Sequence, residues 1–324
     1  MRAGIKGIGF CVPKKVLTNR DLEKMVDTSD EWIRTRTGIS ERRIAEKGTG
    51  TSDLAQEAAL IALKNAGVLP GDVDLIIAAT TTPDMPLPSC ACLVQKKIGA
   101  TKAAAFDLGA ACAGFVYALI TAEQFIKNGT YRNILVIGAD LISSYIDWTD
   151  RSTCVLFGDG AGAVLLAPVQ SGGILSGVLG SDGQYADLLK ISAGGSKTPA
   201  SAETVNAKEH YLKMSGSEVF KLAVRGMADA VNGALAKAGL KLEDIACFIP
   251  HQANQRIVDA VAERLHFPKE KVYINLFKYG NTSAASCAIA LYEAVEEGRI
   301  KKKDKVVMAT FGSGLVWGAL ILEW

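Results

Sequence analysis

Cys112 stands in a stretch of small residues, 109–114, that leads into an apolar helical pattern. A thiol at the start of a helix lies beside free backbone N–H groups and a partial positive charge, and both favour the thiolate. The small neighbours let a substrate approach the sulfur closely. These features indicate a nucleophilic cysteine, and the alternative is a cysteine that only packs in a buried helix.

One of the three histidines is placed where α/β proteins bind ligands. His251 follows an apolar strand pattern over residues 245–250, and ligand sites lie at the ends of such strands. A structural histidine is the alternative. His210 and His266 have charged or amphipathic surroundings, so we interpret them as surface residues. Asn281 precedes a helical pattern, and its simplest interpretation is an N-cap.

Glycines flank a turn between two strand patterns near the C-terminus, in residues 310–317. Its backbone N–H groups could form an oxyanion hole. It is not a P-loop, and residues 158–162 lack the dinucleotide fingerprint, so NAD or ATP use is poorly supported. Cys90 and Cys92 have the wrong spacing for a zinc knuckle. The basic cluster at residues 32–43 indicates either phosphate binding or an ordinary solvated loop.

Short Val- and Ile-rich runs alternate with longer amphipathic segments, which predicts α/β layers with mostly parallel sheets. Residues 171–207 are rich in Gly and Ser and show no clear period, so we place the boundary between two halves there. The expected strands are 74–80, 133–138, 162–167, 245–250, 305–310 and 315–322, and the expected helices are 52–66, 114–128, 216–238, 255–265 and 283–297.

An internal repeat supports two similar halves. Residues 62–67 resemble residues 234–239, and the acidic residue and isoleucine that follow keep the same offset of 172. The helices after Cys112 and Asn281 end at Gly129 and Gly298, an offset of 298 − 129 = 169, which superposes Asn281 on Cys112. We therefore expect a duplicated unit whose two equivalent helix starts lie near a pseudo-twofold axis.

Composition excludes several classes of protein. The 324 residues are 49% hydrophobic and 22% charged, as in an ordinary globular protein. Lys plus Arg number 36 and Asp plus Glu 34, so no strong field attracts nucleic acid. The start lacks an apolar signal core, and the longest nearly uncharged stretch, 108–122, is too short to span a bilayer. Seven cysteines without an export signal argue against a disulfide framework. We expect a cytoplasmic protein.

Several segments in order resemble the β-ketoacyl-acyl carrier protein synthase III family, the initiating condensing enzymes of bacterial fatty-acid synthesis. They are Asp-Glu-Trp-Ile-Arg-Thr-Arg-Thr-Gly-Ile at 30–39, the turn around Cys112, Pro-His-Gln-Ala-Asn at 250–254 and Tyr-Gly-Asn-Thr-Ser at 279–283. The resemblance covers nearly the whole chain. It implies the α/β thiolase fold, with two similar halves, 1–170 and 171–324, in a layered αβαβα core.

The resemblance implies a catalytic trio of Cys112, His251 and Asn281. An acyl-CoA would load its acyl group on Cys112. Malonyl-acyl carrier protein would then lose carbon dioxide, with His251 and Asn281 donating hydrogen bonds to the enolate. Backbone N–H groups of Cys112 and Ser313 would hold the later oxyanion. No metal or other cofactor is implied.

The resemblance also implies residues that bind substrates and partners. A homodimer is expected, in which Leu87 stands where some members carry a Phe that closes the acyl pocket across the dimer, and this smaller residue would admit longer or branched primers. Gln252 and Arg256 would help to dock the acidic carrier protein. Trp32 and Arg151 would sandwich the CoA adenine beside Arg36 and Thr37, and Met214, Gly216, Phe220, Ala253 and Asn254 would line the pantetheine tunnel.

Other interpretations of the sequence require different residues. A thiolase needs a second cysteine near the C-terminal Gly turn, where none stands. A papain-like protease places its Cys in a Cys-Gly-Ser/Ala-Cys-Trp/Tyr motif, which is absent. Polyketide-type ketosynthases and a related acyltransferase remain open. A non-catalytic acyl-CoA-binding member of the fold is the alternative from another class.

Overall fold

Two sheets form the centre of the protein in the computed structural model, which describes residues 2–324. Two smaller pairs, β2 (Val16–Thr18) with β3 (Glu41–Arg43) and β9 (Leu189–Ile191) with β10 (Leu212–Met214), lie outside them. The first sheet has the order β1 (Arg2–Cys11), β7 (Asp159–Val169), β6 (Ile134–Leu141), β4 (Leu75–Ala79) and β5 (Ala104–Leu108). The second has the order β11 (Cys247–Pro250), β12 (Lys305–Gly312), β13 (Val316–Glu323) and β8 (Gly173–Ser181).

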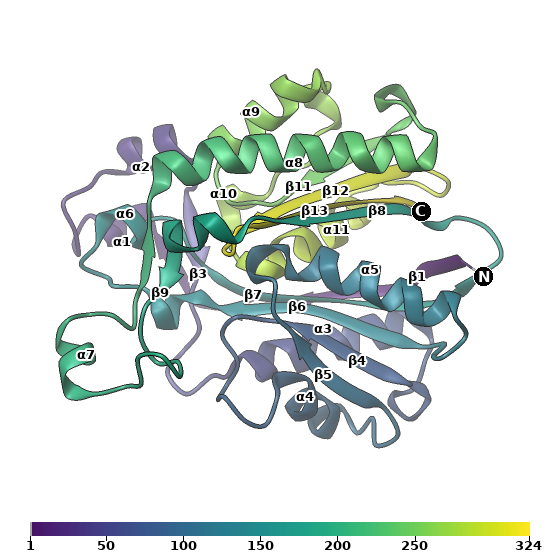
Figure 1. Cartoon of the computed structure of the whole chain (residues 1–324), viewed down its shortest axis with the longest axis horizontal. Helices are drawn as coiled ribbons and strands as arrows, with labels where there is room; N and C mark the ends of the chain where they lie inside the picture. Colours follow the sequence, from purple (N-terminus) through teal and green to yellow (C-terminus); the bar gives the residue numbers. More distant parts are fainter. Residues whose placement is uncertain (1) are drawn as a thin grey trace.

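Helices cover both sheets and fill the space between them, so the five layers alternate as αβαβα (Figure 1). The helices α5 (Gly114–Lys127) and α11 (Ser286–Glu296) contact both sheets and form the middle layer. On the outside, α3 (Thr51–Ala66) and α4 (Cys90–Ile98) pack on the first sheet, and α8 (Gly216–Ala238) packs on the second with α9 (Gln255–Leu265) beside it. Three main apolar cores hold the layers together: one joins α3 and α4 to the first sheet, one surrounds α5 and α11 between the two sheets, and one joins the second sheet to α8 and α9. The thiolase-type layering expected from the sequence is confirmed.

The expectation of mostly parallel sheets is wrong. Only β4–β5, β4–β6 and β11–β12 run parallel, while β1–β7, β6–β7, β12–β13 and β13–β8 run antiparallel. The connection from β12 to β13 explains one case, because three residues, 313–315, are too few for a parallel crossover. Apolar runs alone do not record strand direction, since antiparallel strands buried on both faces look the same.

The duplication is present, and its register corrects the sequence alignment. The short helical turns η1 (Pro70–Asp72) and η5 (Leu242–Asp244) differ by 242 − 70 = 172, as do η2 (Ala111–Ala113) and η7 (Ser283–Ala285), with 283 − 111 = 172. Cys112 therefore corresponds to Ala284 and not to Asn281. The offset of 169 holds only at the C-terminal ends of α5 and α11, because α11 has 11 residues and α5 has 14.

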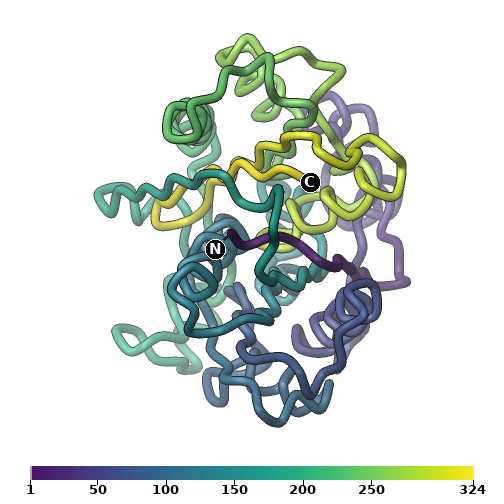
Figure 2. Tube along the Cα trace, turned by 90° about the vertical axis from the view of Figure 1, so that its right-hand side faces the viewer, coloured from purple at the N-terminus to yellow at the C-terminus, as the bar shows by residue number. Residues whose placement is uncertain are grey.

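Residues 171–207 are not an unstructured boundary. They contain β8, which pairs with β13 at the edge of the second sheet, as well as β9. In Figure 2 this teal segment runs through the upper part of the molecule and then descends to its lower left edge. The remaining short elements are α1 (Asn19–Leu22), α2 (Asp30–Thr37), η3 (Ile142–Tyr145), α6 (Arg151–Cys154), η4 (Gly183–Leu188), α7 (Ala202–Asn206), η6 (Lys269–Lys271) and α10 (Leu276–Tyr279).

Candidate active site

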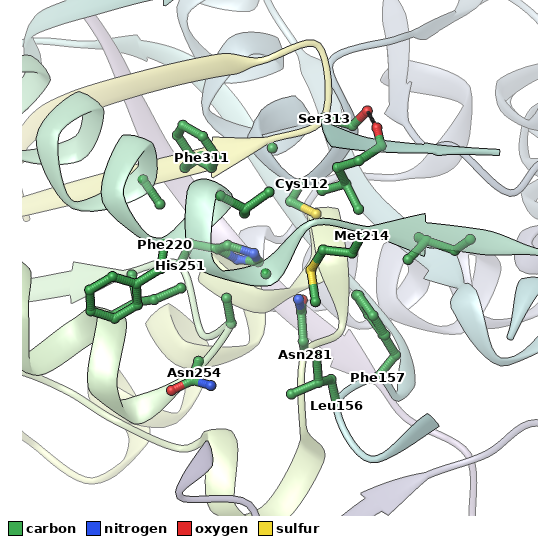
Figure 3. A pocket seen from close by; sticks show the side chains of 18 of the residues that line it. Cys112, Leu156, Phe157, Met214, Phe220, His251, Asn254, Asn281, Phe311 and Ser313 are labelled. Atoms are coloured by element: carbon green, nitrogen blue, oxygen red, sulfur yellow. Dashed lines mark hydrogen bonds between the residues drawn. The ribbon is translucent and has the colours of Figure 1, made fainter. Parts of the chain in front are cut away.

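A pocket of about 700 Å³ lies between the two halves of the fold, and Cys112, His251 and Asn281 all border it. Cys112 comes from η2, His251 directly follows β11, and Asn281 precedes η7. Figure 3 shows the thiol, the imidazole and the carboxamide directed toward the same part of the pocket. Three residues far apart in the sequence are thus brought together.

The backbone around Cys112 is compact on both sides. Ala111 has a left-handed φ of 44°, which turns the chain sharply from β5 into η2 and α5. On the other side, the C-terminal end of β12 lies against Cys112, since a Cβ on Gly312 would lie 2.8 Å from the Cys112 backbone nitrogen. Cys112 is the second residue of η2, where backbone N–H groups have no acceptor within the helix.

The Cys112 thiol is a hydrogen-bond acceptor. Ser283 Oγ donates to Cys112 Sγ over 3.3 Å. Burial raises the pKa of Cys112 to about 12 and outweighs the Ser283 hydrogen bond, which lowers it, while the carboxylate of Asp140 raises it further. Burial therefore favours the protonated thiol, in contrast to the tendency expected from the helix start. Loading an acyl group requires that this proton leave.

His251 is buried, with 3% of its surface exposed, and burial lowers its pKa to about 4. Its backbone N–H donates to Ala309 O over 2.7 Å, which holds the residue at the end of the second sheet. Its Nδ1 lies 2.6 Å from Ser286 Oγ. The ring is therefore neutral at pH 7, and Nε2 is the nitrogen left for the pocket.

The two ends of the Asn281 carboxamide have different surroundings: Oδ1 binds the backbone, and Nδ2 is left for the pocket. Its Oδ1 accepts the Ser283 backbone N–H over 2.9 Å, so its Nδ2 is the group left to face a substrate. The Asn281 backbone is held by Leu156 O and by the N–H of Gly158. The alternative interpretation of Asn281 as an N-cap holds in part: Thr282 and Ala285 occupy the cap positions of η7 and α11 without a side-chain cap hydrogen bond, while Asn281 Oδ1 binds the first N–H of η7.

Five residues expected in the tunnel all line the pocket, among them Met214 and Phe220 (Figure 3). Asn254 Nδ2 donates to Arg36 O over 3.2 Å and so links α9 to α2 at the mouth. Arg256 is exposed there, with its Cζ 5.9 Å from the Phe220 ring centroid. The other lining residues of this group are Gly216 and Ala253.

Trp32, Arg36 and Thr37 also line the pocket, and Arg151 lies just beside it. The Arg151 Cζ is 4.9 Å from the Trp32 ring centroid, and the Arg36 Cζ is 5.4 Å from it. Arg151 therefore stacks directly on the indole. An adenine ring would enter between Trp32 and Arg151 only if the guanidinium moved, so the sandwich stays a prediction.

Comparison with known proteins decides the family. A family described as 3-oxoacyl-[acyl-carrier-protein (ACP)] synthase III matches residues 106–183, and its C-terminal part matches residues 235–324. The chain is 55% identical over 326 residues to the beta-ketoacyl-[acyl-carrier-protein] synthase III of Natranaerobius thermophilus, covering 99% of both chains. The chain belongs to the β-ketoacyl-[acyl-carrier-protein] synthase III family. It is a condensing acyltransferase that initiates fatty-acid synthesis.

Solved structures of synthase III enzymes have the same fold. The enzyme from Aquifex aeolicus is 50% identical with a TM-score of 0.93, and 99% of this chain matches 100% of that one. The enzyme from Pseudomonas aeruginosa is 40% identical with a TM-score of 0.93, covering 100% of this chain and 98% of that one. A priming β-ketosynthase from the R1128 polyketide pathway is 36% identical with a TM-score of 0.92, covering 99% and 96% of the chains.

Two residues predicted for a synthase III site lie elsewhere. Gln252 is 1% exposed. Its Nε2 donates to Pro250 O and Tyr273 O, and its Oε1 accepts the Asn275 N–H, so the side chain cannot reach a carrier protein. Leu87 is 84% exposed and does not border the pocket of its own chain. A single copy therefore leaves the predicted role of Leu87 unfilled.

Ser313 lines the pocket opposite Cys112, and its Oγ donates to Leu189 O over 2.5 Å. The hydroxyl is bound to Leu189 O, so the backbone N–H is the group that this turn offers to a substrate.

Across residues 2–324, no group of three or more His, Cys, Asp or Glu side chains is arranged to hold a metal ion. None of the helices in that range is both long and apolar enough to cross a membrane.

The sequence missed most of the pocket's apolar wall and two serines. Ser283 and Ser286 contact Cys112 and His251, but a serine in a short motif carries no sign of what it touches. Part of the apolar wall comes from short segments without a clear period, which supply Ile142, Val155, Leu189 and Leu212. The helix α8 and the strand β12 supply Met227 and Phe311.

Proposed function

We propose that this synthase loads the acyl group of an acyl-CoA primer on Cys112 and then condenses it with malonyl-acyl carrier protein. The products are a 3-oxoacyl-acyl carrier protein, carbon dioxide and CoA. The observation that carries the proposal is the convergence of Cys112, His251 and Asn281 on one largely apolar pocket.

In the loading step, the Cys112 sulfur attacks the thioester carbon, and the bond from that carbon to the CoA sulfur breaks. The thiol proton passes to the departing CoA sulfur, so the step releases no net proton. The neutral His251 at the same pocket is the candidate to carry it, because Ser286 can accept a hydrogen bond from Nδ1 and so leave Nε2 free to take a proton.

In the condensation step, the carbon–carbon bond to the malonyl carboxylate breaks and carbon dioxide leaves. The enolate oxygen then accepts hydrogen bonds from Asn281 Nδ2 and from His251 Nε2, with Ser286 now donating to Nδ1. The carbanion attacks the acyl carbon, and the Cys112 sulfur leaves and takes a proton from solvent. Backbone N–H groups of Cys112 and Ser313 would stabilise the tetrahedral oxyanion.

The residues that line the pocket suit a substrate with a long, flexible arm. Met214, Gly216, Phe220, Ala253 and Asn254 border the path from the mouth to Cys112, a suitable place for pantetheine. Trp32, Arg36, Thr37 and Arg151 gather at the mouth, where aromatic and cationic groups suit a nucleotide. The exposed Arg256 suits an acidic carrier protein.

We also propose a homodimer without a metal or other cofactor, acting in the cytoplasm, with halves 1–170 and 171–324. The exposed apolar loop around Leu87 supports the dimer, since Met85 is also 44% exposed. The strand correspondence supports the halves, because β1 and β7 begin the same pattern as β8 and β13.

The test is product formation from acetyl-CoA or isobutyryl-CoA with either malonyl-acyl carrier protein or malonyl-CoA. We expect a 3-oxoacyl-carrier protein as the main product. Equal turnover with malonyl-CoA alone would favour a polyketide-type ketosynthase, and acyl exchange without carbon dioxide release would favour a simple acyltransferase. CoA binding with neither reaction would favour the non-catalytic member of the fold.

A further inference from the structure

Ser283 occupies a position that mirrors the turn before the nucleophile. By the offset of 172, Ser283 corresponds to Ala111, and both residues have a left-handed φ, 51° and 44°. Such a φ is uncommon outside glycine and is kept only where surrounding contacts hold it. The first half of the fold thus uses this sharp turn to present the Cys112 thiol, and the second half uses it to present a hydroxyl.

Hydrogen bonds hold the Ser283 turn in place. The Ser283 N–H donates to Asn281 Oδ1 over 2.9 Å, and the Ala284 N–H donates to Asp140 Oδ2 over 3.1 Å. Asp140 is fully buried and accepts further hydrogen bonds from the hydroxyls of Thr80 and Thr82. The turn is therefore tied to β6 of the other half, which limits how far Ser283 can move.

The Ser283 hydroxyl reaches the reacting atom itself. Its Oγ lies 3.3 Å from Cys112 Sγ, and the residue is 1% exposed, so water does not compete freely for this contact. We propose that Ser283 is a catalytic residue whose hydroxyl donates a hydrogen bond to the Cys112 sulfur and stabilises its thiolate. The idea rests on the proposed role of Cys112 as the nucleophile.

A donor is needed because the other surroundings of the sulfur disfavour negative charge. Burial and the Asp140 carboxylate on β6 raise the pKa of Cys112, whereas Ser283 and the Cys112 N–H lower it. The thiol of Cys287 on α11 and the neutral His251 after β11 are the other titratable groups nearby. Neither carries a positive charge at pH 7, so hydrogen bonds are what this site offers to a thiolate.

The thiolate appears twice in the proposed reaction, which gives Ser283 two points of action. It is the attacking group when the primer is loaded and the leaving group when the condensation product separates. A hydrogen bond that strengthens as negative charge develops on the sulfur lowers both barriers. Loss of the hydroxyl should therefore slow both half-reactions and leave CoA binding unchanged.

The test compares Ser283→Ala with Ser283→Gly in the full-length protein. Both remove the hydroxyl, but glycine adopts the left-handed φ without strain and alanine does not. The readout is the rate of Cys112 alkylation by iodoacetamide between pH 7 and 9, mapped by mass spectrometry, with Cys112→Ala to mark background labelling. Ser176→Ala is the matched control, because Ser176 is a buried serine that donates to Ala234 O outside the pocket.

We expect both Ser283 variants to react about threefold to tenfold more slowly than the native chain at each pH. Loss of the donor reduces the thiolate fraction about tenfold, and the greater nucleophilicity of a thiolate with a higher pKa offsets part of this. Ser176→Ala should react like the native chain. The KM for acyl-CoA should be unchanged in both Ser283 variants while the loading rate falls.

Three results would overturn the inference. The first is a native alkylation rate in both Ser283 variants. The second is a slow rate in Ser283→Ala with a native rate in Ser283→Gly, which would assign the effect to backbone strain. The third is a Ser176→Ala variant that reacts as slowly as the Ser283 variants. If Ser283→Ala fails to fold, the unstrained glycine variant alone decides. If alkylation depends on Ser283 but acyl-CoA never acylates Cys112, the proposed function fails and the catalytic role of Ser283 fails with it, while the hydrogen bond from Ser283 to the Cys112 sulfur stands.

Discussion

At the scale of single residues, the site works with neutral groups. Burial favours the protonated Cys112 thiol and the neutral His251 imidazole, because it raises the pKa of the first and lowers the pKa of the second. Two serines of the 283–286 segment hold these groups, one on each. Hydrogen-bond donors therefore replace fixed positive charges as the means of stabilising developing anions.

The lowered pKa of the buried His251 makes the stability of the folded chain depend on pH. Its pKa falls from an ordinary value near 6.5 to about 4, so between these values the unfolded chain binds the proton more readily than the folded one. Burial of His251 therefore costs no stability above pH 6.5, and the free energy of unfolding decreases as the pH falls toward 4. The loss from this group is about 3 kcal/mol.

Urea unfolding at pH 7 and at pH 4.5 checks this, with His251→Gln as the comparison. Other groups titrate as well, so the difference between the two proteins isolates His251. The native chain should lose more stability than the variant over this range. Equal losses would contradict a neutral buried His251.

The trio of Cys112, His251 and Asn281 was predicted from the family resemblance, and the structure places all three side chains at one pocket. The sequence could not reveal the contacts of Ser283 and Ser286, since these arise only when η7 packs against η2 and α11 packs against β11. Arg42 shows the same limit. It belongs to the basic cluster of the sequence, yet it is fully buried and donates to Leu17 O, Asn19 Oδ1 and Val155 O.

At the scale of elements, positions are set by close backbone contacts between the two halves. The turn after β12 lies against η2, and a Cβ on Gly312 would come 3.2 Å from the Ala111 Cβ as well as 2.8 Å from the Cys112 nitrogen. Neither partner is the end of a flexible side chain. The nucleophile's backbone would therefore have to shift to accept any side chain at residue 312.

Gly312→Ala tests this contact. We expect both primer loading and condensation to fall about a hundredfold, because a small displacement of a nucleophile costs that much. The measurement is single-turnover acylation and discharge of Cys112, with circular dichroism to confirm folding. Gly183→Ala is the matched control, since a Cβ there meets no atom within 4 Å. Native rates in Gly312→Ala would contradict the proposed coupling of the two turns.

Long periodic elements were predictable to the residue. The sequence ranges expected for α8 and α9 agree with the structure, because amphipathic spacing is sustained and Gly239, with its left-handed φ of 66°, ends α8 cleanly. β8 was missed, since its glycines resemble a loop and only pairing with β13 makes it a strand. Short elements around the pocket have too few residues to show a period.

At the scale of the whole molecule, one chain leaves an apolar loop uncovered. Leu87 and Met85 are exposed and do not line the pocket that contains Cys112. The proposed dimer would bring Leu87 to the partner's acyl pocket, where its size would limit the primer. The single chain holds the reactive groups, and the second copy would contribute the limit on primer size.

Leu87→Phe tests this arrangement. We expect the ratio of kcat/KM for isobutyryl-CoA over acetyl-CoA to fall about tenfold, because a larger side chain removes space for the branch. The assay is condensation with malonyl-acyl carrier protein at matched protein concentration, together with sedimentation to record the dimer. An unchanged ratio in a dimeric variant would remove Leu87 from the pocket.

The most direct test of the central claim is intact-protein mass spectrometry after incubation with acetyl-CoA, followed by peptide mapping and a chase with malonyl-acyl carrier protein. The native chain should carry one acetyl group on Cys112 and release it as acetoacetyl-carrier protein. His251→Ala and Asn281→Ala should condense about a hundredfold to a thousandfold more slowly, and Asn281→Ala should still acquire the acetyl group. A native chain that condenses while Cys112 stays unmodified, or a Cys112→Ala variant that still forms acetoacetyl-carrier protein, would contradict the account.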